Sequence, residues 1–74
     1  MNKKIIRFYR DTIRSCFWET CVVYHPDGRI EIHSMHVRRE DSHCLKEKIE
    51  WVSPARAEKY IAQNERYIIE RYEE

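Results

Sequence analysis

The sequence predicts an α+β fold, in which a four-stranded antiparallel β-meander precedes one C-terminal α-helix packed on one face of the sheet. Three features predict it: a tight turn at residues 25–29, an alternating segment at residues 43–52, and a helix start at Ser53. A chain of 74 residues and 9.2 kDa can bury one small hydrophobic core. Residues 1–74 are therefore expected to form a single domain.

The turn His25-Pro26-Asp27-Gly28-Arg29 is the strongest local signal in the chain. Proline presets the first turn position, and glycine adopts the left-handed conformation that closes the turn. The flanking runs, residues 16–24 and 30–37, are rich in β-branched and aromatic residues, as strands are. Residues 4–9 have the same composition and form the first predicted strand.

Residues 43–52 fit two patterns. Leu45, Ile49 and Val52 match a helical spacing, whereas Leu45, Ile49 and Trp51 alternate as in a strand. We predict a strand, because Ser53-Pro54 starts a new element and holds the preceding residue extended. The alternative fold has three strands followed by two helices.

The C-terminal helix is predicted to begin at Pro54, with Ser53 as its N-cap. Apolar side chains recur at helical spacing after it, and charged residues lie between them. A helix of about 19 residues would be about 28 Å long and fray near Glu73. The stripe consists of Ala57, Ile61, Ile68 and Tyr72, flanked by Tyr60 and Ile69.

The turn also predicts which face of the sheet the helix covers. If Pro26 to Gly28 form a three-residue loop, Tyr24 lies opposite Ile30, and the alternation then sorts both strands into faces. The covered face holds Trp18, Val22, Tyr24, Ile30 and Ile32, joined by Ile6 and Phe8. The opposite face is more apolar than a solvated face should be. Its predicted partner-binding residues are Phe17, Cys21, Val23, His33, Met35, Val37, Arg38 and Arg39.

The charges suggest a second hypothesis. The net charge is +1, well below the basic excess of a dedicated DNA-binding domain. Residues 1–39 nevertheless carry eight lysines and arginines against four acids, whereas residues 40–74 carry six against nine. The alternative function is nucleic-acid binding by the basic half. Its candidate residues are Arg7, Tyr9, Arg10, Arg14 and Arg29.

No pattern in the sequence indicates catalysis, a bound metal or a cofactor. Seven residues have metal-binding side chains, but Cys16 and Cys21 have opposite strand parity and so point to opposite faces. A Cys21–His33 pair would lack an oxyanion hole and an orienting third group. The chain has no glycine-rich phosphate loop and no His-Glu-x-x-His motif.

Three cysteines cannot all pair within one chain, and the N-terminus has no apolar stretch of signal-peptide length. We therefore expect a cytoplasmic protein with reduced thiols. No stretch is apolar for long enough to span a membrane.

The sequence as a whole predicts a small non-enzymatic binding protein. Chains of this size without a catalytic constellation are often inhibitors or adaptors, including those with which phages and other mobile elements act on host machinery. The expected mechanism is occlusion of a partner protein by the uncovered sheet face. A second copy of the chain is the other occupant that this face could take.

Overall fold

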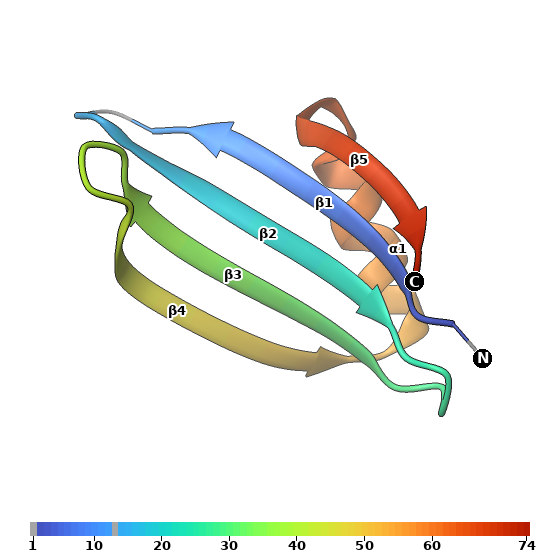
Figure 1. The fold of residues 1–74 in the computed structure, drawn as a ribbon. Helices are drawn as coiled ribbons and strands as arrows, with labels where there is room; N and C mark the ends of the chain where they lie inside the picture. The colour runs from blue at the N-terminus through green and yellow to red at the C-terminus, as the bar shows by residue number, and fades with distance from the viewer. Residues whose placement is uncertain (1, 13) are drawn as a thin grey trace.

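The computed structural model describes residues 2–12 and 14–74, and its fold is α+β. Five antiparallel strands form one sheet in the order β4-β3-β2-β1-β5 (Figure 1). The α+β class was predicted, but the four-strand count and the alternative with three strands and two helices are wrong. The elements are β1 (Lys4–Asp11), β2 (Cys16–Tyr24), β3 (Ile30–Arg38), β4 (His43–Val52), the helix α1 (Pro54–Gln63), the short 3₁₀ helix η1 (Glu65–Tyr67) and β5 (Ile68–Glu73).

The β2–β3 turn has the predicted three-residue loop. The amide of His25 donates to the carbonyl of Arg29 at 2.9 Å, and Gly28 has φ 94°, a backbone conformation that favours glycine. The predicted register follows, from Tyr24 opposite Ile30 to the far end of both strands without interruption. The two faces of β2 and β3 are therefore those that the sequence predicted.

Residues 43–52 form the strand β4, as predicted. β4 pairs with β3 along its length, and an irregularity at His36 and Val37 is taken up on β4, where Leu45 has no partner. Because the extra residue lies on β4, the pairing of β2 with β3 stays regular.

The helix α1 begins where the sequence placed it. The Ser53 Oγ accepts a hydrogen bond from the Arg56 amide at 3.2 Å, and proline occupies the first turn. The helix then ends after 10 residues rather than about 19. The backbone amide and the side-chain Nδ2 of Asn64 both donate to the carbonyl of Tyr60, which closes the last turn.

The chain after Asn64 returns along the sheet as β5, so the predicted helix through Tyr72 is wrong. β5 pairs with β1 from Lys4 to Phe8, with an irregularity that leaves Ile69 unpaired. Residues 67–69 are one tyrosine and two isoleucines, which favour strands. Pairing with β1 also satisfies the backbone groups that would otherwise form an exposed edge.

The hydrophobic core lies between α1 and the sheet face that we call the helix face. Ala57 of α1 is fully buried against it, and Phe8 packs edge-on against Tyr60 at 5.3 Å between ring centroids. α1 is about 15 Å long, whereas the nine residues of β2 extend about 30 Å. It therefore covers only part of that face (Figure 1). The buried core cluster is Phe8, Val22, Ile30, Ile32 and Ala57.

Among the described residues, no helix has the length and apolar character needed to cross a membrane.

Candidate protein-binding face

The sheet face opposite α1, which we call the open face, is turned towards the viewer in Figure 1, with α1 behind it. Both helical segments, α1 and η1, contribute residues that pack on the other side. Alternation places eight side chains of β2 and β3 on the open face, in the pairs that the sequence predicted. These are Phe17, Glu19, Cys21 and Val23 on β2, and Glu31, His33, Met35 and Val37 on β3.

Burial differs along the open face. Val37 and, on β1, Ile5 are only 8% exposed. Phe17, Val23 and Met35 are half-buried. The apolar residues of β2 and β3 that were predicted to bind a partner are thus at most partly exposed, and the most exposed apolar side chains lie on another strand.

The most exposed apolar side chains of the open face are on the edge strand β4. Ile49 lies opposite His33 and is 54% exposed, and Trp51 lies opposite Glu31 and is 53% exposed. The sequence predicted that both lie in a strand, but the pairing of that strand with β3, which places them on the open face, was not worked out. The alternation of Ile49 with Trp51 was the signal that would have found them.

Arg7 crosslinks three strands in the centre of the open face. Its guanidinium donates to Glu19 on β2 and to Glu70 on β5, each at 2.7 Å. These two hydrogen bonds raise the pKa of Arg7 above its already high ordinary value, so the group stays charged. On the β4 side, His33 Nε2 and Glu47 Oε2 lie 2.9 Å apart.

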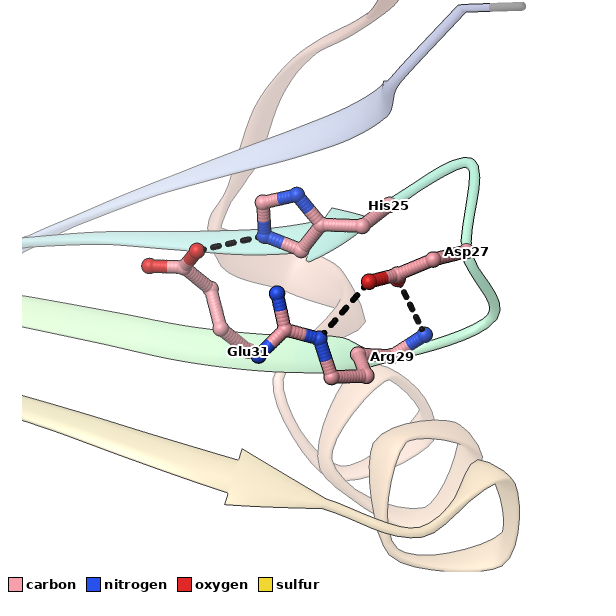
Figure 2. A network of polar contacts seen from close by, with 4 residues as sticks. All are labelled: His25, Asp27, Arg29 and Glu31. Carbon is pink, nitrogen blue, oxygen red and sulfur yellow. Dashed lines mark hydrogen bonds and ion pairs between the residues drawn. The ribbon is translucent and has the colours of Figure 1, made fainter.

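The turn end of the open face carries a polar network of His25, Asp27, Arg29 and Glu31 (Figure 2). The His25 ring points from the end of β2 towards Glu31, with 2.6 Å between Nε2 and Oε1. Asp27 accepts from the Arg29 backbone amide at 3.0 Å and from its Nε at 2.8 Å, and these bonds lower the pKa of Asp27. The Arg29 guanidinium also lies 4.6 Å from the centroid of the Trp51 ring.

The opposite end of the open face is built around Phe17. Its ring stacks on Tyr9 with centroids 5.0 Å apart, and the Arg39 guanidinium lies 5.3 Å from the ring centroid. Arg39 also donates to the Tyr9 hydroxyl at 2.8 Å and to Asp11. Arg39 therefore belongs to the open face, as predicted.

Arg38, in contrast, lies opposite Cys16 and shares the parity of the helix face. It binds Asp41 through two hydrogen bonds of 3.0 and 2.7 Å. The bonds from Arg38 and from the His43 amide hold the pKa of Asp41 well below its ordinary range. Arg38 thus helps to close the β3–β4 turn, and only Arg39 extends the predicted patch.

Cys21 lies opposite His33, as the register predicted. Burial raises the pKa of the Cys21 thiol, and the nearby Arg7 charge offsets this only in part. A raised pKa disfavours the thiolate, which is the reactive form. The environment of Cys21 therefore opposes its use as a nucleophile.

The five residues of the nucleic-acid hypothesis do not come together. Arg7 and Tyr9 lie on the open face, where carboxylates or other side chains engage them. Arg10 lies on the helix face opposite Trp18. Arg14 is in the β1–β2 connection, and Arg29 is in the turn at the other end of the sheet. The basic half of the sequence is therefore not one basic surface.

Within residues 2–12 and 14–74, no three His, Cys, Asp or Glu side chains are grouped so that they could hold a metal ion. Cys16 and Cys21 are half-buried and Cys44 is exposed, and all three are free.

Comparisons of the chain with known proteins found no matching family model, no matching curated protein and no matching solved structure.

Proposed function

We propose that the protein is a non-enzymatic binding protein that covers part of a partner protein with its open face. The observation that carries the proposal is the exposed pair Ile49 and Trp51, which continues the apolar middle of the face onto the edge strand. Aromatic and arginine side chains that become buried when a partner binds are typical of the residues that contribute most to protein interfaces. Trp51 with Arg29 above its ring is such a pair.

The charges of the open face support the same proposal. Arg7, Arg29 and Arg39 are each paired with a carboxylate of the same molecule. A charge that is already paired leaves no unpartnered ion when a partner displaces water, and unpartnered buried ions are the costly case. The face can therefore be covered without new charged partners. Occlusion of this kind suits an inhibitor or an adaptor working in the cytoplasm.

A capture experiment with a double variant tests the proposal. Val23→Lys/Met35→Lys places two charges in the middle of the open face, and Lys59→Glu on the exposed side of α1 is the control. We expect the wild type and the control to retain a specific protein from a native lysate, and the double variant to lose it while keeping its circular dichroism spectrum.

Two results would contradict the proposal. Capture that survives the double substitution would mean that the open face is not the contact surface. Unfolding of the double variant would mean that Val23 and Met35 are core residues. Light scattering of the wild type in parallel distinguishes a protein partner from a second copy of the chain.

A further inference from the structure

The helix face carries a cleft where α1 ends and the sheet continues. It encloses about 270 Å³, close to the lower end of small-molecule pockets, which is roughly 300 Å³. Thr20 and Ser34 of the sheet line it, with Tyr60 and Tyr67 from the helical layer and Trp18 from β2. The Thr20 hydroxyl donates to Ser34 Oγ at 3.3 Å. With Phe8, the cleft thus combines four aromatic side chains with the hydroxyl groups of Thr20, Ser34 and the two tyrosines.

Arg10 and Trp18 also line the cleft, and they begin a row of four side chains that crosses the sheet from there. Arg10 lies opposite Trp18, Trp18 opposite His36, and His36 opposite Lys46, so the row spans β1 to β4. The Trp18 and His36 rings stack with centroids 4.6 Å apart and planes 13° apart. Three strand spacings make the row about 14 Å long. Its ends are cationic and its middle is aromatic.

The cations of this row differ from the arginines of the open face. Among the described residues, neither Arg10 nor Lys46 forms an ion pair. The guanidinium of Arg10 instead lies 5.2 Å from the centroid of the Tyr67 ring, as does that of Arg66 at 5.3 Å. An anion can therefore bind at this end of the helix face without first displacing a carboxylate.

We propose that this cleft binds a nucleotide of single-stranded nucleic acid. The base stacks against the Trp18 and tyrosine rings, and its phosphate lies at Arg10. Lys46, at the far end of the row, contacts a phosphate further along the strand. Aromatic platforms flanked by cations bind single strands in this way, because every base presents a ring face and every linkage a charge. The site is separate from the open face, where carboxylates oppose the approach of phosphates, so it adds a function to the proposed protein binding.

The two tryptophans of the chain make the proposal testable, because they lie on opposite faces. In Trp51→Phe the sole tryptophan is Trp18 in the cleft, and in Trp18→Phe it is Trp51 on the open face. The probes are a single-stranded oligothymidylate of about eight nucleotides and thymidine monophosphate. We expect the oligonucleotide to quench fluorescence in Trp51→Phe and to leave it unchanged in Trp18→Phe.

Charge variants then assign the phosphate contacts. Arg10→Gln in the Trp51→Phe background should weaken binding about tenfold and reduce the salt slope by about 0.7, the value for one phosphate contact on a single strand. Arg29→Gln removes the same charge from the opposite face and should change neither. Both arginines are exposed, and circular dichroism checks that the variants fold.

Each result decides the proposal. Quenching by thymidine monophosphate alone at the same phosphate concentration would keep the cleft as the site and identify a free nucleotide as its ligand. An absence of quenching in Trp51→Phe at low salt would overturn the proposal. Equal loss of binding in Arg10→Gln and Arg29→Gln would overturn it as well, because the attraction would then be diffuse.

Discussion

Val22 and Val23 are neighbours on β2, yet Val22 has no exposed surface and Val23 is partly exposed. Val22 faces α1 and belongs to the core cluster, whereas Val23 lies opposite Glu31 on the open face. The same residue type therefore has two roles, and the helix on one side of the sheet makes the difference. Apolar alternation in a sequence identifies both faces of a strand, but only the second layer decides which face stabilises the fold.

The two sides of the sheet also differ in how their charges are arranged. On the open face, Arg7 is held between Glu19 and Glu70. On the helix face beyond α1, Arg10 contacts a tyrosine ring instead. A paired charge suits a surface that a protein covers, and a cation without a carboxylate suits one that an anion approaches.

Among substitutions by alanine, the largest difference between the faces is expected for two matched phenylalanines. Phe8→Ala removes a ring that is 3% exposed in the core and should lower the free energy of unfolding by about 3 to 5 kcal/mol. Phe17→Ala on the open face should cost about 1 kcal/mol, because its ring stacks on Tyr9 and Arg39 and lies outside the buried core cluster. Urea unfolding measures both. Equal costs would mean that the open face is a second core.

A smaller difference is expected for the two isoleucines of β5. Ile68 packs against the core cluster, whereas Ile69 falls at the irregularity in the pairing with β1 and is exposed. Ile68→Ala should lower the free energy of unfolding by about 2 kcal/mol, and Ile69→Ala by less than about 0.5 kcal/mol. Thermal unfolding checks the order of the two effects. A larger cost at Ile69 would mean that β5 pairs in another register.

Loss of the N-cap of α1 should lower the free energy of unfolding by less than loss of the Ile68 side chain does. Ser53→Ala removes the acceptor for the Arg56 amide and should cost about 1 kcal/mol. Ser53→Asp keeps an acceptor at the same position and serves as the control. An unchanged thermal midpoint in Ser53→Ala would show that this helix layer does not depend on its cap.

The alkylation rates of Cys21 and Cys44 compare a partly buried and an exposed position without changing the stability of the fold. Cys44 is exposed, whereas burial raises the pKa of the Cys21 thiol. The raised pKa lowers the thiolate fraction of Cys21 at neutral pH, so its alkylation should lag behind that of Cys44 and accelerate only as the pH rises. Mass spectrometry after iodoacetamide treatment follows each cysteine. If Cys21 were modified faster than Cys44 at pH 7, its thiol would not be buried as the structure shows.

The parts of this fold that the sequence predicted are those whose chemistry is local. The proline and glycine of the β2–β3 turn set the register, and Ser53-Pro54 set the start of α1. The strand β5 was missed because Ile61, Ile68 and Tyr72 fit a helical period. Its actual conformation depends on Asn64 ending the helix and on pairing with β1, about sixty residues earlier in the chain.

The two candidate sites differ in the same respect, since the open face could be predicted from the sequence and the cleft could not. The open-face residues of β2 and β3 followed from the turn, so Phe17, Val23 and Met35 lie where the sequence put them. The position of Trp51 on the open face could have been predicted by also pairing β4 with β3. The cleft beside Trp18 could not be predicted, because it exists only where a helix of 10 residues stops short of the end of the sheet.

The difference between Val22 and Val23 is tested most directly by placing the same charge at both positions. Circular dichroism and thermal unfolding of Val22→Lys and Val23→Lys measure whether each variant folds. Val22→Lys should be unfolded, because the core has no partner for a buried charge. Val23→Lys should keep the fold with a midpoint within about 4 °C of the wild type, since its side chain reaches water beside Glu31. A folded Val22→Lys or an unfolded Val23→Lys would contradict the assignment of one core face and one binding face.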